Sequence, residues 1–386
     1  MILTTKQMEG LKIAVQRFRN REPYTVIAGY AGTGKSTLIR FIIDALEIES
    51  EEVSYVAYTG KATLVLQDKG CPNATTAHKL LYFSKQRSDG TYYHYPRPFL
   101  ENPHLKLIVV DEVSMLPQTM WDLLMRHKVH VIACGDPFQL PAIGENCTVL
   151  DNPHIFLDEI MRQAAESEII RLSMDIRERK PLKPFEGEEI RVYRKKDMVE
   201  GMYTWADQII CATNKTRSYI NNYMRSLYYG DLALEGPQPG DRIICLRNDW
   251  EFCTFDGHPL VNGMLGTLDY MELYPCEGYG THCFIDFSPD GLPLGYIDLD
   301  IDYKFITEGK ETFTKENYKR FKAGGIKPPH LFDYGYAISC HKSQGSEYDK
   351  VLLIEEWWPT NEEEHARWLY TGLTRAREKA TIIMKD

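Results

Sequence analysis

The sequence predicts an α/β protein with two α/β domains, the second of which is interrupted by a β-rich insertion. Short apolar runs rich in Val and Ile alternate with segments whose apolar residues recur at helical spacing. The alternation continues to about residue 240, stops, and returns after Pro328-Pro329. Because strands that alternate with helices are typical of parallel sheets, we expect each α/β domain to contain one.

The first 150 residues predict one such domain. Buried strands are expected at 24–29, 53–58, 105–112 and 129–136, and helices at 35–46 and 116–127. The segment 82–100, "YFSKQRSDGTYYHYPRPFL", breaks this pattern. Its Asp89-Gly90 pair lies between aromatic residues, which predicts a β-hairpin insertion.

The second α/β domain is predicted over 151–240 and 331–386, with an all-β insertion at 241–330. Its helices are expected at 167–180 and 214–229, and its strands at 208–213, 333–340, 349–356 and 379–384. Between them, 237–250, 260–273, 281–289 and 294–306 are strand-like and separated by Gly and Asp turns. This part predicts a small β-barrel-like insert.

Composition limits the class of protein. Of the 386 residues, 43% are hydrophobic, no apolar run approaches the roughly 18 residues of a membrane span, and the first 20 do not resemble a signal peptide. We therefore expect a soluble, cytoplasmic protein with no membrane contact. The nine cysteines include no C-x-x-C pair, which favours reduced thiols. The spacing of His258, Cys276, His282 and Cys283 matches no common zinc site, so we interpret these as core residues.

The net charge of −10 argues against an open electrostatic grip on duplex DNA, because proteins that bind in that way usually carry a basic excess. It does not exclude a narrow channel. A groove lined locally by basic and aromatic side chains can hold a single strand while the remaining surface is acidic.

Residues 29–36, "GYAGTGKS", match the phosphate-loop pattern G-x-x-x-x-G-K-[ST] between a predicted strand and a predicted helix. Glycines allow backbone N–H groups to surround a β-phosphate, Lys35 adds positive charge near the β and γ oxygens, and Ser36 can ligate Mg²⁺. The residues expected to bind ATP are Gly32, Thr33, Gly34, Lys35, Ser36 and Thr37.

Further catalytic candidates follow the next two strands. "LIVVDEVS" ends a buried strand in Asp111, expected to hold Mg²⁺, and Glu112, expected to activate the attacking water. In "GDPFQLPAI", Gln139 is the candidate to sense the γ-phosphate. These features predict a nucleoside triphosphatase. The base-reading motif of GTPases is absent, because Lys215 is followed by Thr216 and Arg217.

Six motifs in order, "GYAGTGKST", "DEVSM", "GDPFQLPAI", "EIMRQ", "YAISCHKSQGSEYDKV" and "YTGLTRARE", resemble superfamily 1 DNA helicases. The RecD/Dda-like branch, which moves 5′ to 3′, is the most similar. The resemblance implies two RecA-like P-loop NTPase lobes with ATP between them and single-stranded DNA crossing both. It also implies that the 82–100 hairpin is a strand-separating pin and that 241–330 is an SH3-like β-barrel.

The resemblance also implies roles for individual residues. Gln7 matches the glutamine that reads the adenine edge, and Glu347 lies where relatives reach toward the nucleotide. The positions that match DNA contacts are Thr59, Lys61, Thr76 and His78 in the first lobe, Asn214, Arg217, His341, Lys342 and Ser343 in the second, and Tyr92 and Tyr93 in the pin. An alternative for His78 is a core or capping histidine.

The resemblance implies that Arg162 in "EIMRQ" and Arg375 in "GLTRARE" are arginine fingers that reach the γ-phosphate from the second lobe. Arg162 is expected just inside a helix and Arg375 in a helical turn. Arg377, two residues further, is expected to face a salt bridge or solvent.

Two functions remain open from the sequence. The favoured one is an ATP- and Mg²⁺-dependent helicase that acts on single-stranded DNA and duplex junctions as a monomer, with possible replication or repair protein partners. The alternative is a strand-binding or annealing factor whose affinity ATP switches. Hydrolysis stimulated by single strands, together with release of a strand from a partial duplex, distinguishes them.

Overall fold

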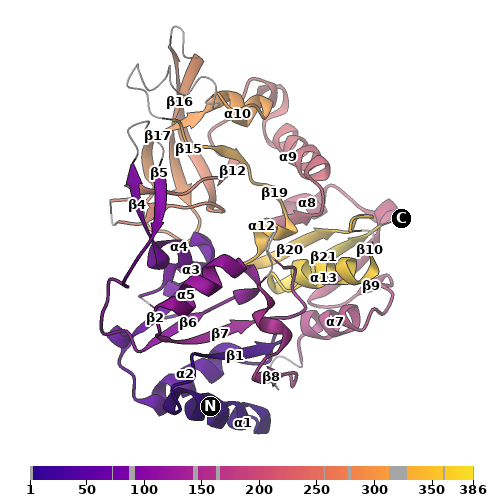
Figure 1. Ribbon diagram of the computed structural model, residues 1–386. Coiled ribbons are helices and arrows are strands. Elements are labelled where there is room, and N and C mark those ends of the chain that lie inside the picture. The colour runs from indigo at the N-terminus through magenta and orange to yellow at the C-terminus, as the bar shows by residue number, and fades with distance from the viewer. Residues whose placement is uncertain are drawn as a thin grey trace. The chain divides into compact units, whose positions relative to one another are not determined.

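The computed structural model describes residues 3–71, 73–86, 92–141, 147–161, 166–255, 257–276, 280–312, 328–359 and 361–385 (Figure 1). The chain divides into two compact units. Unit 1 contains residues 1–83, 95–212 and 343–386, and unit 2 contains residues 84–94 and 213–342.

Unit 1 contains a six-stranded sheet in the order β3-β2-β6-β7-β1-β8, and every pair in it is parallel. The predicted parallel α/β domain is therefore confirmed. In chain order the strands are β1 (Tyr24–Gly29), β2 (Val53–Ala57), β3 (Thr75–Thr76), β6 (Leu107–Val110), β7 (His130–Gly135) and β8 (Ile155–Leu157). The helices are α1 (Thr5–Arg19), α2 (Lys35–Leu46), α3 (Gly60–Asp68), α4 (Ala77–Leu81) and α5 (Gln118–Arg126).

Helices cover both faces of this sheet, which is why its strands are nearly continuous in apolar residues. One core lies between the sheet and helices α1 and α2, with Ala14, Leu38 and Ile42 buried in it. The other lies on the opposite face, where α4 and α5 bury Leu81 and Leu124 (Figure 1). The carboxyl ends of β1, β6 and β7 all lie at one edge of the sheet, because parallel strands end on the same side.

The strands of a second sheet that belong to unit 1 run in the order β11-β20-β21-β10-β9. Neighbours are parallel except for the edge strand β9, which is antiparallel to β10. The strands are β9 (Phe185–Glu186), β10 (Ile190–Arg194), β11 (Gln208–Cys211), β20 (Tyr348–Ile354) and β21 (Ala376–Met384). The helices of this part are α7 (Glu168–Arg177), α8 (Gly201–Trp205) and α13 (Glu362–Leu373).

Unit 2 is built on an antiparallel sheet in the order β17-β16-β15-β12-β18, with a separate two-stranded ribbon, β13-β14. Its strands are β12 (Arg242–Cys245), β13 (Asp249–Cys253), β14 (Pro259–Leu260), β15 (Leu265–Cys276), β16 (Gly280–Pro289), β17 (Tyr296–Asp302), β18 (Phe332–Tyr334) and β19 (Ala337–Ser339). Its helices are α9 (Asn214–Tyr229) and α10 (Tyr303–Glu308), and the first three residues of α12 (Cys340–Ser343) also belong to it.

The two edges of the unit 2 sheet are bridged. Ile301 of β17 pairs with His330, two residues before β18, through backbone hydrogen bonds from Asp302 N to His330 O (2.9 Å) and from His330 N to Asp300 O (2.7 Å). The bridge brings the first and last strands together around a core that contains Phe287, the side chain of which is fully buried. The all-β insertion is thus present, and its SH3-like character stays a prediction.

Unit 2 also takes in α9, which the sequence assigned to the second α/β domain. Arg225 of α9 is buried, and its Nε lies 3.1 Å from both carboxylate oxygens of Asp241. The Asn221 amide donates to Tyr334 O at 2.9 Å. These contacts join α9 to the β-rich part, so the compact units differ from the predicted boundaries at 240 and 331. The division into two RecA-like lobes and an insert remains a prediction.

Strands β4 (Tyr82–Gln86) and β5 (Tyr92–Pro96) form a two-stranded sheet within the segment predicted as a hairpin. The rings of Phe83 and Tyr95 stack with centroids 5.6 Å apart. Tyr92 and Tyr93 belong to β5, and their side chains lie outside what the structure describes. Whether the hairpin separates strands is a functional question that the fold leaves as a prediction.

Two expectations from composition concern the described residues. None of their helices has both the length and the apolar character that crossing a bilayer requires. The eight cysteines whose side chains are described form no disulfide, in line with the expected reduced thiols. Cys283 is fully buried in unit 2, and His282 bonds to the Asp300 carboxylate at 2.8 Å.

Candidate nucleotide-binding site

The phosphate loop connects β1 to α2 at the carboxyl edge of the first sheet. Gly32 and Gly34 adopt left-handed conformations, with φ of 74° and 76°. A Cβ atom on Gly34 would lie 2.5 Å from the Gln7 amide nitrogen, so both conformation and space require glycine there. The loop leads directly into the N-terminus of α2, where free backbone N–H groups and the helix dipole favour an anion.

The polar side chains of the loop hold its shape. The Thr33 hydroxyl is buried and donates to Tyr30 O at 2.8 Å. The Lys35 ammonium donates to Gly29 O at 2.9 Å and to Tyr30 O at 3.0 Å. Ser36 and Thr37 follow on the first turn of α2, and Ser36 is exposed. The loop therefore places a cation and a hydroxyl at the helix N-terminus, as the motif predicts.

Asp111 and Glu112 follow the last residue of β6. Burial raises the pKa of the Asp111 carboxyl, and a 3.0 Å hydrogen bond from the Glu112 N–H partly offsets the rise. Burial also raises the pKa of Glu112, which the charge of Arg375 partly offsets. Glu112 adopts a left-handed conformation with φ of 47°, uncommon for a side chain of its size. Two partly desolvated carboxylates therefore face one site.

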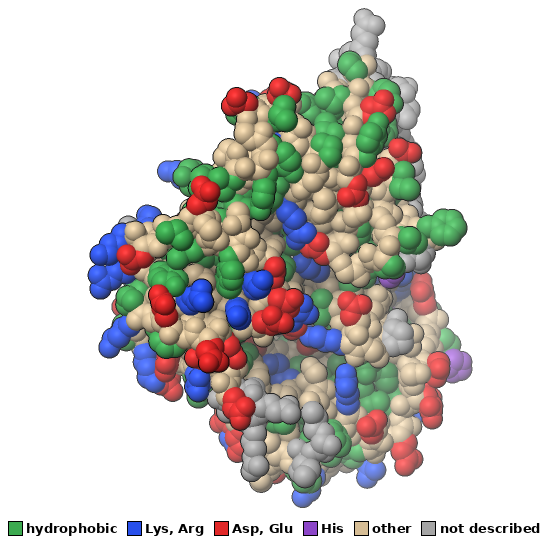
Figure 2. Space-filling view, turned by 180° about the vertical axis from the view of Figure 1, so that it is seen from behind, with side chains coloured by type: hydrophobic (Ala, Val, Ile, Leu, Met, Phe, Trp, Pro, Cys, Tyr) green, Lys and Arg blue, Asp and Glu red, His purple; other side chains and the backbone are tan. Residues whose placement is uncertain are grey.

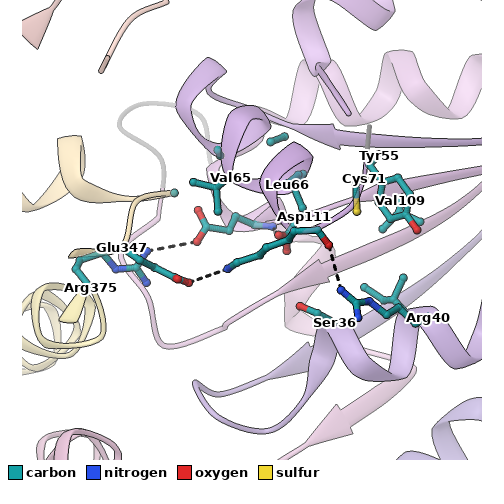
Figure 3. Close-up of a pocket in the computed structure, with 16 residues that line it drawn as sticks. Ser36, Arg40, Tyr55, Val65, Leu66, Cys71, Val109, Asp111, Glu347 and Arg375 are labelled. Carbon is teal, nitrogen blue, oxygen red and sulfur yellow. Dashed lines mark hydrogen bonds and ion pairs between the residues drawn. The ribbon is translucent and has the colours of Figure 1, made fainter. Parts of the chain in front are cut away.

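Arg375 reaches these carboxylates from the C-terminal part of unit 1. Its side chain is 6% exposed, and its Nη1 lies 3.5 Å from Glu112 Oε1 (Figure 3). Its Nε donates to Thr371 O at 3.1 Å. The prediction that Arg375 lies in a helical turn is wrong in detail, because α13 ends at Leu373 and Arg375 lies in the following turn.

Arg377 differs from Arg375 as expected. It lies on β21, its side chain is 55% exposed, and it forms an ion pair with Asp349 at 2.7 Å. Arg375 lies in the turn that follows α13 and Arg377 lies in β21, so the change from turn to strand, and not helical spacing, separates the two arginines. The other predicted finger, Arg162, lies outside the described residues.

A cavity of about 120 Å³ connects these elements (Figure 3). Ser36 of α2, Asp111 and Glu112 after β6, and Glu347 and Arg375 from the C-terminal segment line it. Glu347 forms an ion pair with Lys69 at 3.0 Å. The structure thus brings together five of the residues predicted to bind or hydrolyse the nucleotide.

Tyr370 is a site residue that the sequence did not reveal. Its hydroxyl donates to Asp136 Oδ2 at 2.5 Å and accepts from the Ala31 N–H of the phosphate loop at 2.8 Å. Tyr370 is fully buried, Asp136 is 3% exposed, and burial raises the pKa of Tyr370. A tyrosine on an amphipathic helix is normally interpreted as a core residue. The one feature of the sequence that could have indicated a role at the site is that Tyr370 belongs to the same motif as Arg375.

Gln139 lies in the loop after β7, three residues after Asp136. Its side chain is buried, and its Oε1 has no hydrogen-bond partner among the described residues. Buried amide oxygens are normally paired, so the unpaired oxygen indicates a group held ready for another partner. The next residue, Leu140, donates its N–H to the Thr371 hydroxyl at 2.9 Å.

Gln7 touches the phosphate loop from α1. Thr4 and Gln7 form a capping box at the start of this helix. The Gln7 amide nitrogen donates to Thr33 O at 3.2 Å, and the side chain is 1% exposed. The structure therefore places Gln7 beside the nucleotide loop, and its reading of an adenine edge stays a prediction.

The predicted DNA contacts of the first lobe have local structural roles. The Thr59 and Thr76 hydroxyls cap α3 and α4, each accepting a backbone N–H at 3.2 Å. The Lys61 ammonium donates to the Tyr348 hydroxyl at 3.2 Å. The His78 ring lies 5.7 Å from the Tyr58 ring and 6.0 Å from the Tyr82 ring. These contacts fix the residues in place, and DNA binding by them stays a prediction.

The remaining predicted DNA contacts lie in or next to unit 2. Asn214 is the first residue of α9, and Arg217 forms an ion pair with Asp333. Burial lowers the pKa of His341 and of Lys342, and the nearby Arg217 lowers that of Lys342 further. A half-buried cation with a cationic neighbour suits an anionic ligand.

Ser343 differs from its neighbours because its side chain is fully buried. The predicted role of Ser343 in DNA binding stays a prediction.

Comparison with known proteins agrees with this geometry. The family model described as an AAA domain matches residues 5–204, and that of a UvrD-like helicase C-terminal domain matches residues 334–383. The chain is 26% identical to the ATP-dependent RecD2 DNA helicase of Deinococcus radiodurans over 92% of its own length. It spans 46% of that relative, which is about half.

Two further relatives span comparable lengths. The chain is 22% identical to the ATP-dependent DNA helicase dda of Enterobacteria phage T4. That match covers 97% of this chain and 98% of the phage protein. A solved structure of a Bacteroides Pif1 helicase in complex with ADP-AlF₃ and single-stranded DNA matches with a TM-score of 0.56 at 18% identity. That match covers 100% of this chain and 95% of the other, and it supports the fold.

The AAA-domain match covers more than half of the chain and contains the phosphate loop, Asp111 and Glu112, while the helicase C-terminal match contains Arg375. The chain therefore belongs to the AAA domain family, and its place there is with the superfamily 1 helicases of the RecD/Dda-like branch.

Proposed function

We propose that this protein is an ATP-dependent DNA helicase that moves 5′ to 3′ on single-stranded DNA and unwinds duplex DNA. The observation that carries the proposal is the position of Arg375. A guanidinium from the C-terminal segment lies 3.5 Å from the Glu112 carboxylate, in the same cavity as Ser36 and Asp111. A nucleotide site completed by a distant part of the chain can make hydrolysis depend on the arrangement of both parts.

ATP fits the residues of the site. The left-handed glycines and the α2 N-terminus would surround the phosphates, and Lys35 would exchange its two carbonyl partners for phosphate oxygens. The Asp111 carboxylate and the Ser36 hydroxyl line the same cavity, and oxygen ligands of this kind suit Mg²⁺. Ser36 and Asp111 would hold Mg²⁺, which when bound offsets negative charge on the phosphates.

Each remaining side chain has a role in hydrolysis. Glu112 would accept the proton of the attacking water, and the unpaired Gln139 oxygen would orient that water. Arg375 would stabilise the charge that develops on the γ-phosphoryl oxygens. Tyr370 would transmit the state of the site, because it bonds at once to the phosphate loop and to Asp136.

DNA is the proposed substrate because the relatives are named DNA helicases and one is solved with single-stranded DNA. In this chain, the half-buried Lys342 and the exposed Tyr95 of β5 are the features that suit a strand of DNA. The direction 5′ to 3′ rests on resemblance to the RecD/Dda-like branch.

The experiment that tests the proposal measures two activities on one preparation. ATP turnover is measured with and without oligothymidylate, and strand release is measured on a partial duplex with a 5′ single-stranded tail. We expect strand-stimulated turnover and ATP-dependent release. Stimulated turnover without release would favour the alternative, an ATP-switched strand-binding or annealing factor.

The proposed pin has its own test. Replacing Tyr92, Tyr93 and Tyr95 with Ala should reduce unwinding far more than strand-stimulated hydrolysis, because translocation needs no wedge. Phe185→Ala on the edge strand β9 removes another exposed aromatic ring and is the matched control. Equal loss of both activities in the hairpin variant would contradict the role of a pin.

A further inference from the structure

Unit 2 exposes an aromatic sheet face that the proposed activity does not use. Tyr270 and Tyr274 of β15 are 53% and 45% exposed. Tyr274 lies edge-on to Phe284 of β16, with ring centroids 5.5 Å apart. The cross-strand register pairs Tyr270 with Asp286 and Glu272 with Phe284, so these side chains lie on the face opposite the buried Ile285. We call Tyr270, Glu272, Tyr274, Phe284, Asp286 and Asp298 the β15–β17 face.

The carboxylates of this face surround the aromatic rings. The Tyr270 hydroxyl lies 3.4 Å from Glu272 Oε2, and the Asp298 N–H donates to Asp286 Oδ1 at 3.1 Å. The charge of Glu272 is the largest cause of the raised pKa of Tyr270, and the charges of Asp286 and Asp298 raise that pKa further. All three carboxylates therefore act on one ring, and the described residues include no ion pair that uses Glu272, Asp286 or Asp298.

The excess of acidic over basic residues extends along the sequence around this face. Residues 248–303 contain eleven Asp and Glu residues and no Lys or Arg, a net charge of −11. The whole chain carries −10, so the rest is close to neutral, at +1. Figure 2 shows red and green side chains mixed over the upper part of the molecule, where these strands lie. Such a surface repels phosphates, so a nucleic acid is a poor occupant.

We propose that the β15–β17 face is a docking site for a basic, arginine-containing peptide segment of a partner protein. Charge complementarity determines the occupant. Guanidinium groups stack on tyrosine and phenylalanine rings and pair with carboxylates, and this face offers both within one patch. The site is independent of ATP hydrolysis, and it gives the protein a place to hold another protein while unit 1 retains the nucleotide.

The test uses a fluorescein-labelled decapeptide with five arginines and the same peptide with citrulline in their place. Fluorescence anisotropy with the full chain should show binding of the arginine peptide that weakens with salt, because exposed charges are screened over about 10 Å at 0.1 M. Glu272→Gln with Asp298→Asn should weaken it by about fivefold or more, and so should Tyr270→Ala with Tyr274→Ala.

The matched control is Asp231→Asn with Glu235→Gln, which removes the same charge from exposed residues of unit 2 outside the face. It should change the dissociation constant by less than about twofold. Melting temperature and strand-stimulated ATP turnover should be unchanged in all variants, which shows that they fold.

Three results would overturn the proposal. The first is equal binding of the arginine and citrulline peptides, and the second is an equal effect of the control variant. The third is a dimer of the wild-type chain in sedimentation that Glu272→Gln with Asp298→Asn dissociates, since the face would then join two copies. Weaker oligothymidylate binding by that variant would assign the face to DNA and also contradict us.

Discussion

Replacing Arg375 with lysine tests whether this side chain acts as an arginine finger. The guanidinium is almost fully buried and reaches Thr371 O from Nε, and Ser346 O and Glu112 from Nη1, at 3.1, 3.4 and 3.5 Å. A lysine ammonium keeps the charge but cannot serve these three directions at once. We therefore expect the charge to remain near the site and its alignment to be lost.

The size of the effect follows from the role. Arginine fingers contribute about 10³ to 10⁵ in rate, or about 4 to 7 kcal/mol of transition-state stabilisation. Because lysine retains the charge, we expect the lower end, a loss of about 10³ in strand-stimulated turnover. Arg377→Lys is the matched control, since its exposed ion pair with Asp349 is worth about 0 to 1 kcal/mol. It should change turnover by less than about threefold.

The assay is ATP turnover at saturating oligothymidylate, with ATP affinity and melting temperature measured on the same samples. Arg375→Lys should bind ATP nearly as the wild type does and remain folded at the assay temperature. If Arg375→Lys turned over ATP at nearly the wild-type rate while Arg377→Lys was inactive, the finger would be assigned to the wrong residue.

Three other variants test the rest of the site. Lys35→Ala should abolish turnover with an unchanged circular dichroism spectrum, and normal turnover would remove the phosphate-loop assignment. Burial raises the pKa of Glu112, and the charge of Arg375 partly lowers it. Arg375→Ala removes that charge and should raise the pKa of Glu112, so the acid limb of the pH–rate profile should move to higher pH. A shift to lower pH would contradict Glu112 as the base. Tyr370→Phe leaves the buried Asp136 carboxylate with one partner fewer and should cost about 1 to 3 kcal/mol in urea unfolding, and an unchanged midpoint would contradict its structural role.

The sequence predicted the parts of the fold that local chemistry decides. The strand at 24–29 was predicted with its observed bounds, because a continuous apolar run precedes the glycine that starts the phosphate loop. The helix at 214–229 was also predicted with its observed bounds, because its apolar residues recur at helical spacing. Arg375 was predicted in a helical turn but lies two residues after the last residue of α13, because nothing local shows that α13 ends at Leu373.

Contacts between distant residues were beyond local reasoning. Tyr370 and Asp136 are separated by 234 positions, and only the folded chain shows that they share a hydrogen bond. The bridge between Ile301 and His330 that joins the edges of the unit 2 sheet has no sequence signature. The burial of Ser343 likewise depends on its neighbours in space, which the local sequence does not show.

The most direct test of the account is strand release from two matched partial duplexes, one with a 5′ and one with a 3′ single-stranded tail. We predict that the chain opens the 5′-tailed duplex with ATP and Mg²⁺, leaves the 3′-tailed duplex intact, and does neither when Lys35 is replaced with Ala. Release from the 3′-tailed duplex alone would contradict the direction. Release by the Lys35→Ala protein would contradict the proposal that hydrolysis at this site drives unwinding.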